Sequence, residues 1–108
     1  MIDWHLVQGF EWDEGNARKN ADKHNVSQAE AEQVFFNSPL LLLPDPRHSL
    51  REKRLYALGK TDEAKLLLVS FTLRASDTQL RVISARPMNR KEREIYEKAN
   101  EDNSQISK

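Results

Sequence analysis

Residues 54–86 hold the pattern that most restricts the fold of this chain. Three apolar segments follow one another there, RLYALGK (54–60), KLLLVSFTLR (65–74) and QLRVISAR (79–86), and four residues separate each from the next. Segments of this length and composition are typical of strands. A four-residue turn joins antiparallel strands, because parallel neighbours need a crossover of about a dozen residues or more. We therefore expect an antiparallel sheet, with residues 65–74 near its centre.

A fourth strand is expected just before these three. LLLLPD (40–45) is a short apolar run that Pro44 ends, and it suits a buried or an edge strand. The polar loop PRHSLREK then leads into residues 54–60. In that strand, alternation places Arg54, Tyr56 and Leu58 on one face and the residues between them on the other.

Local end signals predict three helices. Asp13 can cap the first, whose thin apolar stripe ends at His24, and Asn25 suits the left-handed residue that closes a helix. Ser27 and Glu30 form a capping box for the second helix, which runs to about Phe36. The last helix starts at Asn89, with Glu92 as the second member of its capping box. We expect it to bury Met88, Ile95, Tyr96 and Ala99.

The element order is therefore ααββββα, which predicts an α+β fold. We expect a four-stranded antiparallel sheet with the helices packed on one face, which leaves the other face open for a site. Residues 1–99 are expected to form a single domain, since 108 residues suffice for one core but not for two. Residues 100–108 are expected to be a frayed tail.

Composition excludes several classes of protein. The chain has no cysteine, so it can form neither a disulfide nor a thiolate metal site. No apolar run approaches the roughly 20 residues of a membrane helix, and the N-terminus is too acidic for a signal peptide, so we expect a cytoplasmic protein. The net charge is zero, but residues 1–47 hold eight acids against four bases and residues 48–108 nine acids against thirteen bases. Such a dipolar chain can offer a basic side to a polyanion, unless the charges are simply scattered over a solvated surface.

The arginines are the main candidates for chemistry. His5, His24 and His48 lack metal-ligand spacing, and the three glycines form no phosphate loop. Arg81 and Arg86 flank one strand, Arg54 opens another and Arg74 ends a third; these could bind a polynucleotide backbone, because arginine holds its charge and grips phosphate bidentately. The alternative is that each one pairs with an acid or is solvated at a strand end.

The spacing of Arg81 and Arg86 raises an objection to a shared site. By strict alternation Arg81 lies with Ile83, and Arg86 lies on the other side with Ser84. Both can serve one site only if the strand twists or bulges near Arg86, which precedes Pro87. Otherwise at least one of the two is structural.

Two further pairs carry alternative interpretations. Lys23 and His24 supply a cation and a group that titrates near neutrality, so His24 could act in acid–base chemistry, or the pair could stabilise a helix C-terminus as cations. Glu52 and Arg54 point the same way, and they could be a base with a phosphate clamp or a plain ion pair.

Three stretches together resemble the BrnT family of bacterial type II toxins. They are FEWDEGNARKNADKHNVS (10–27), EKRLYALGK (52–60) and RVISARPMNRKEREIYE (81–97), in the family's order and covering most of the chain. Two departures are visible, since Asn25 replaces the usual glycine and Pro87 follows the Ile-Ser-Ala-Arg motif. Asparagine also accepts the left-handed conformation, so the first change is tolerable.

The resemblance implies a RelE-like ribonuclease fold and RNA cleavage that arrests translation. Our leading hypothesis is an endoribonuclease that needs no metal ion, because the RNA's own 2′-hydroxyl attacks the adjacent phosphate and the protein supplies no nucleophile. The resemblance also implies a BrnA-type ribbon-helix-helix antitoxin as partner, through which alone the toxin would reach operator DNA, and neither a cofactor nor a membrane. We assign catalysis to five residues and RNA binding to three. The catalytic set is Arg81, Arg86, Arg54, Glu52 and His24, and the RNA-binding set is Lys23, Lys19 and Arg74. The alternative function is a non-catalytic module whose basic sheet face binds nucleic acid or protein.

Overall fold

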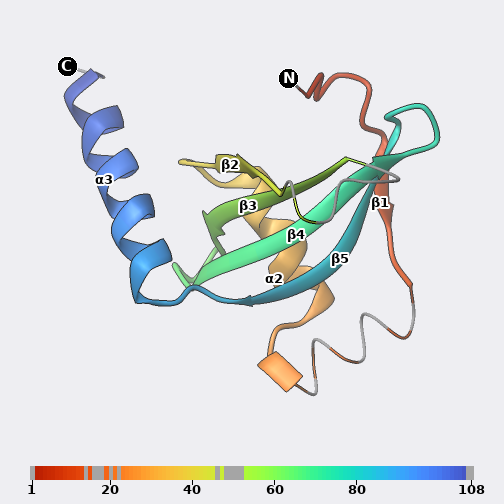
Figure 1. The fold of residues 1–108 in the computed structure, drawn as a ribbon, viewed down its shortest axis with the longest axis horizontal. Coiled ribbons are helices and arrows are strands. Elements are labelled where there is room, and N and C mark those ends of the chain that lie inside the picture. The colour runs from red at the N-terminus through yellow and green to blue at the C-terminus, as the bar shows by residue number, and fades with distance from the viewer. Residues whose placement is uncertain are drawn as a thin grey trace.

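The computed structural model describes residues 2–13, 15, 19, 21, 23–45, 47 and 53–106. Five strands and two α-helices follow in the order β1 (Gly9–Glu11), α2 (Gln28–Gln33), the 3₁₀ turn η1 (Val34–Phe36), β2 (Leu41–Pro44), β3 (Arg54–Lys60), β4 (Leu66–Arg74), β5 (Gln79–Pro87) and α3 (Arg90–Ile106). Figure 1 shows these elements as a curved sheet with α2 behind it and α3 standing at one end. The α+β class is therefore confirmed.

The sheet is mixed and has five strands in the order β1-β5-β4-β3-β2. The antiparallel pairings β2–β3, β3–β4 and β4–β5 agree with the expected meander. The expectation of a four-stranded, wholly antiparallel sheet is wrong, because β1 adds a fifth strand that pairs parallel with β5, Phe10 opposite Leu80. The long chain between β1 and β5 allows this parallel pairing, which a short turn would forbid.

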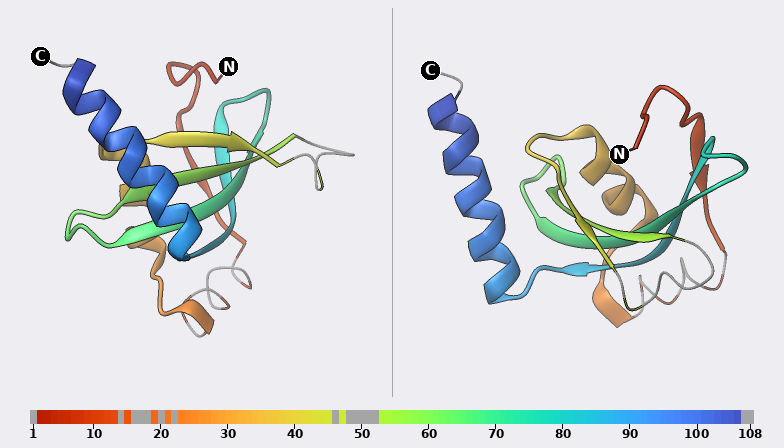
Figure 2. Two further views of the ribbon diagram at one scale, coloured as in Figure 1. Left: turned by 60° about the vertical axis from the view of Figure 1, so that its left-hand side comes forward. Right: turned by 45° about the horizontal axis from the view of Figure 1, so that its top comes forward.

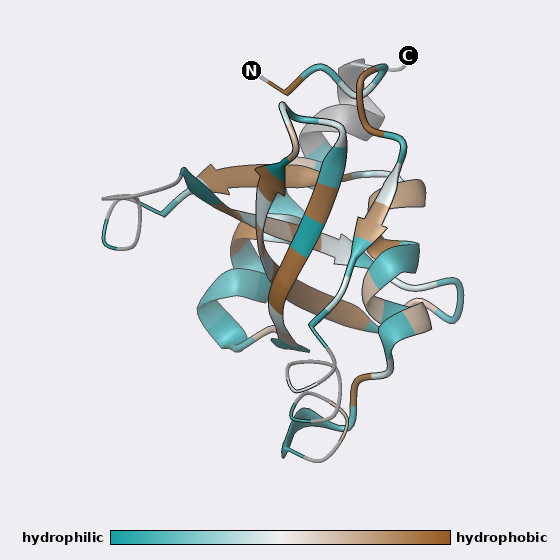
Figure 3. Cartoon of the chain, turned by 90° about the vertical axis from the view of Figure 1, so that its right-hand side faces the viewer, coloured by the Kyte–Doolittle hydropathy of each residue, from teal (hydrophilic) through white to brown (hydrophobic). Residues whose placement is uncertain are grey.

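One face of the sheet carries the larger hydrophobic core. Its buried members come from β3, β4 and β5 and from α2 and η1; they include Ala57, Val69, Phe71, Val82, Ala31 and Val34. The capping box at the start of α2 is present as expected, with Glu30 N donating to Ser27 Oγ at 3.1 Å and Ser27 N to Glu30 Oε1 at 2.9 Å. In Figure 3 the hydrophobic (brown) residues are concentrated in the strands, where they alternate with hydrophilic (teal) ones, while the loops are mainly hydrophilic.

The opposite face carries a smaller apolar cluster under α3. Met88 and Tyr96 join Leu58 and Leu68 there, and the Tyr96 hydroxyl donates to Pro39 O at 2.7 Å. The expectation that all helices cover one face is therefore wrong: α2 and α3 lie on opposite faces, and Figure 2 shows them well apart. Only part of the second face is covered by α3, and we call the remainder the open face. Its central Ser70 and Thr72 are 7% and 1% exposed, while Arg54 and Arg81 on either side of Thr72 are half-buried.

The last helix differs from expectation in two further respects. Ile95 is 40% exposed, so it does not join Tyr96 in the core. Residues 100–106, expected to be a frayed tail, continue α3 as helix to Ile106. The helix keeps its expected start, where Glu92 N donates to Asn89 Oδ1 and Asn89 N to Glu92 Oε1, both at 2.9 Å.

Only part of the first expected helix is described. Gly15, Lys19, Ala21, Lys23 and His24 are helical. Asp13 caps this segment as expected, since its Oδ1 accepts from Gly15 N at 2.8 Å. Asn25 has φ 54°, the left-handed conformation predicted for it.

Gly59 allows the sheet and η1 to approach closely. A Cβ at this position would stand 2.6 Å from Val34 Cγ1 and 3.3 Å from Val34 O. The first distance is shorter than any real carbon contact, so only glycine permits β3 to pack directly under η1. No helix in the described part of the chain is long and apolar enough to cross a membrane.

Candidate active site on the open sheet face

A bulge in β5 decides which arginines share a face. Ser70 pairs with Ser84 and the next residue, Phe71, pairs with Val82, so Ile83 is an extra residue of β5 that has no paired residue on β4. One extra residue reverses the alternation for everything beyond it. Arg81 and Arg86 therefore lie on the same face although five positions separate them. The deformation required for a shared face is present, at Ile83 rather than next to Pro87.

The open face is organised in rows that run across the strands. Arg81 on β5 lies opposite Thr72 on β4, and Thr72 lies opposite Arg54 on β3. Strands are about 4.8 Å apart, which separates the Cα atoms of the two arginines by roughly 10 Å. In the next row Ser84, Ser70 and Tyr56 lie opposite one another, and in the third row Arg86, Leu68 and Leu58 do so.

Four of the predicted arginines thus share one sheet face. Arg74 belongs with them, since it lies two positions from Thr72 on β4. The third row passes under α3, where Leu68 and Leu58 are buried, while Arg54 and Arg81 in the first row are half-buried. A face that gathers four arginines is suited to a phosphodiester backbone.

Arg81 is held loosely by acids. Its Nη1 lies 4.0 Å from Glu11 Oε1 on β1, and its Nη2 lies 3.7 Å from Asp13 Oδ2. Arg74 Nε lies 3.9 Å from the same Glu11 oxygen. Both carboxylates are largely exposed, and these distances are longer than those of a charge-assisted hydrogen bond. A phosphate could therefore replace the acids at little cost.

Arg86 is held tightly. Its Nη1 and Nη2 donate to Glu92 Oε1 and Oε2, each at 2.8 Å, which is a bidentate ion pair. The same carboxylate also accepts from Asn89 N in the capping box of α3. The hydrogen bonds from Arg86 lower the pKa of Glu92, and the same bonds raise the pKa of Arg86. Arg86 therefore connects the sheet to the start of α3.

Tyr56 and Asp45 belong to this face, and sequence reasoning gave neither of them a role. Asp45 is 3% exposed, and its carboxylate acts on the Tyr56 hydroxyl. The pKa of Tyr56 is raised, first by burial and then by the hydrogen bond and negative charge of Asp45. Asp45 looked like a loop residue after Pro44, and a single acid beside a proline gives no signal of burial.

The remaining predicted residues stand apart from these rows. Lys19 and Lys23 are exposed and His24 is half-buried. Among the described residues, no hydrogen bond or ion pair brings these three to the sheet. Glu52 and His48 lie outside the described residues, so the assignment of Glu52 stays a prediction.

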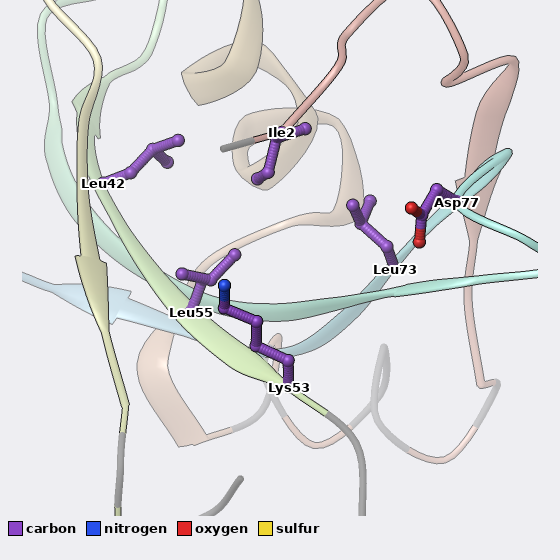
Figure 4. Close-up of a pocket in the computed structure, with 6 residues that line it drawn as sticks. All are labelled: Ile2, Leu42, Lys53, Leu55, Leu73 and Asp77. Atoms are coloured by element: carbon purple, nitrogen blue, oxygen red, sulfur yellow. The ribbon is translucent and has the colours of Figure 1, made fainter.

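No group of three or more histidine, aspartate or glutamate side chains lies close enough to hold a metal ion in the described ranges. A cavity of about 420 Å³ is on the other sheet face, lined by Ile2, Leu42, Lys53, Leu55, Leu73 and Asp77. In Figure 4 its leucines and Ile2 converge from β2, β3, β4 and the N-terminal segment. It is mainly apolar and separate from the arginine rows.

Comparison with known proteins gives the class. The fold is similar to the 1.1 Å crystal structure of the Brucella abortus ribonuclease toxin, BrnT, with a TM-score of 0.60 and 23% sequence identity, covering 78% of this chain and 100% of that one. A comparison with curated protein sequences gave no match. Residues 12–92 match the family described as "Ribonuclease toxin, BrnT, of type II toxin-antitoxin system".

The chain therefore belongs to a class of small α+β ribonuclease toxins from type II toxin–antitoxin systems. Within that class it is a member of the BrnT family, as the sequence resemblance indicated.

Proposed function

We propose that this chain is the toxin of a type II pair and an endoribonuclease that needs no metal ion. In this chemistry the 2′-hydroxyl of the RNA attacks the adjacent phosphate, so the protein supplies no nucleophile. It must remove one proton, donate another and stabilise the extra charge on the phosphorane. The observation that carries the proposal is the shared sheet face of Arg54, Arg74, Arg81 and Arg86.

The roles follow from how each residue is held. Arg81 and Arg54 stabilise the phosphorane, because they stand in the open row and Arg81 has only weak competing contacts. Arg86 fixes α3 against the sheet and adds positive charge at the edge of the site. Glu52 is the general base and His24 an additional acid–base group. The exposed cations Lys19, Lys23 and Arg74 hold the RNA backbone.

The proposed partner is a BrnA-type ribbon-helix-helix antitoxin, which also carries the complex to operator DNA. Toxin and antitoxin would act in the cytoplasm, and the toxin would arrest translation by cutting RNA. A RelE-like arrangement of the site is part of this proposal.

The direct test is cleavage of a defined RNA by the purified chain in excess EDTA. We expect undiminished cleavage that leaves a 2′,3′-cyclic phosphate, because the attacking oxygen belongs to the RNA. Loss of activity on removal of metal would disprove the mechanism. Glu52→Ala separates the enzyme from a simple binding module: it should abolish cleavage and growth arrest while leaving RNA binding nearly unchanged.

A further inference from the structure

The hydroxyl of Tyr56 occupies the middle row of the site without a role in the chemistry above. Tyr56 lies opposite Ser70, between the Arg54–Thr72 row and the Leu58–Leu68 row. Its ring packs against the apolar cluster under α3, and the residue is half-buried. The ring is thereby fixed by packing, while its polar end lies among the charged groups of the open face.

Asp45 holds that polar end in place. Its carboxylate raises the pKa of the Tyr56 hydroxyl by hydrogen bonding and by its negative charge, and its backbone N donates to Arg54 O at 3.1 Å. Asp45 is 3% exposed, and burial of a carboxylate costs free energy unless polar partners surround it. Its burial at the end of β2 therefore depends on these contacts. One residue thus connects the tyrosine hydroxyl and the backbone from which Arg54 emerges.

We propose that Tyr56 is the proton donor to the 5′-oxygen that leaves during RNA cleavage, and that Asp45 is the residue that positions it. The inference rests on the proposed function. As the 2′-oxygen forms its bond to phosphorus, the bond between phosphorus and the 5′-oxygen breaks. The general base takes the 2′-hydroxyl proton, the Tyr56 hydroxyl proton goes to the 5′-oxygen, and water then returns a proton to the tyrosinate. The products are a 2′,3′-cyclic phosphate and a 5′-hydroxyl.

The charged groups around Tyr56 suit a donor better than a base. Asp45 raises its pKa together with burial, whereas Arg47 just beyond β2 and Arg86 on β5 lower it. The net direction is upward, so the hydroxyl keeps its proton near neutral pH and is available as an acid. Once the proton has left, the two arginines stabilise the tyrosinate. Glu92 is already engaged by Arg86, and Asp45 is the acid in the described part of the chain that acts on the hydroxyl.

The test compares two leaving groups in the same RNA. Tyr56→Phe should slow single-turnover cleavage of a normal RNA by about 10²-fold, within the range typical of general acids. A 5′-phosphorothiolate linkage at the same position should restore the variant to nearly the wild-type rate, because a thiolate with a pKa near 8.5 leaves without a proton.

The chain offers a matched control in its second tyrosine. Tyr96 is 3% exposed and its hydroxyl donates to a backbone carbonyl under α3. Tyr96→Phe should lower stability and leave the rates on both substrates unchanged. Asp45→Asn should shift the alkaline limit of cleavage to lower pH, because it removes the charge that holds the proton on Tyr56. A purely structural Asp45 would lower the rate without moving that limit.

Each other outcome has a definite meaning. Full activity of Tyr56→Phe on the normal RNA would overturn the proposal and leave the ribonuclease function standing. Equal slowing on both substrates would show that the hydroxyl only supports the fold, which also overturns it. A wild-type chain that cuts neither substrate would instead disprove the proposed function on which the inference depends.

Discussion

Arg81 and Arg86 stand on the same face of the same strand, yet they are held in opposite ways. Arg86 makes two hydrogen bonds of 2.8 Å to Glu92, whose side chain is only 16% exposed. Arg81 lies 3.7–4.0 Å from Glu11 and Asp13, whose side chains are 43% and 50% exposed. An arginine is thus fixed by its ion pair at one end of β5, and another is available to bind a ligand at the other end.

The difference comes from the element that meets each end. At Arg86 the capping box of α3 presents a carboxylate that is already oriented by Asn89. At Arg81 the neighbour is the three-residue edge strand β1, which offers its acid from a largely exposed position. A short distance to an oriented partner marks a structural arginine, and a long distance to an exposed partner marks one that can receive a ligand.

The largest expected effect is the loss of RNA cleavage when Arg81, the loosely held arginine of β5, is replaced. Arg81→Ala should lower the cleavage rate of a defined RNA by about 10²–10³-fold, as expected when one donor to a developing anion is lost. The free energy of unfolding should barely change, because its ion pairs are long and exposed. Single-turnover kinetics and urea unfolding measure the two quantities.

Arg90→Ala is the matched control for this change. Arg90 is a solvated arginine of α3 that pairs with Glu94 at 3.4 Å, and its loss should leave cleavage intact. Normal cleavage by Arg81→Ala would remove Arg81 from the site. Unimpaired cleavage by both Arg81→Ala and Arg86→Ala would make the whole site assignment wrong, although the function could stand on other residues.

The second prediction concerns the fixed end and its dependence on pH. Glu92→Gln should lower the free energy of unfolding at pH 7 by about 1–2 kcal/mol, toward the smaller value because Arg86 is more than a third exposed. The pKa of Glu92 is lowered in the folded chain, mainly by its hydrogen bonds from Arg86. The contribution is therefore complete above the ordinary glutamate pKa of about 4.3 and is lost as the pH falls through the lower folded value.

Urea unfolding at pH 7 and pH 3 measures this difference. Wild type and Glu92→Gln should differ at pH 7, and the difference should be smaller at pH 3 because part of the folded chain is then protonated at Glu92. Glu94→Gln, which alters an exposed pair on the same helix, should show almost no difference at either pH. A gap of equal size at both pH values would mean that the loss comes from packing rather than from the ion pair.

The smallest effect is expected at the acid beside Arg81. Glu11→Gln removes the nearest charge that competes with phosphate for Arg81 and Arg74, so RNA should bind a few-fold more tightly at low salt. Fluorescence anisotropy with a non-cleavable 2′-deoxy oligonucleotide measures the affinity. Glu63→Gln, in the exposed turn at the other end of the sheet, removes the same charge and should have a smaller effect. Weaker binding by Glu11→Gln would mean that Glu11 orients Arg81 rather than competing for it.

The sequence predicted those features that depend on neighbouring residues. Strands β3, β4 and β5 were found within one residue, because alternation over seven or more positions can be counted. Both capping boxes were found, because Ser27 with Glu30 and Asn89 with Glu92 carry the signal within four residues. The left-handed Asn25 was found for the same reason.

Features that depend on distant parts of the chain were missed. The strand β1 has only Gly9, Phe10 and Glu11, too few for a period, and its pairing with β5 is decided by tertiary packing. The side on which α3 packs is set by the path after Pro87 rather than by the helix itself. Asp45 was missed because no neighbouring residue signals its burial, and Tyr56, whose pKa it raises, lies eleven positions further on.

Regular alternation puts two residues on the same face only when an even number of positions separates them, and Arg81 and Arg86 are five apart. The bulge at Ile83 makes up the difference, so every residue of β5 before Ile83 lies on the face opposite to the one that regular alternation would give it. Removal of Ile83 would leave Arg81 and Arg86 four positions apart, so regular alternation would keep both on the same face, and Val82 in the core, without any bulge. The strand would lose only the local bend and twist that the bulge gives it. Insertion of a second residue beside Ile83 would instead reverse the alternation and turn Arg81 toward the core, so this motif should tolerate a one-residue deletion better than a one-residue insertion.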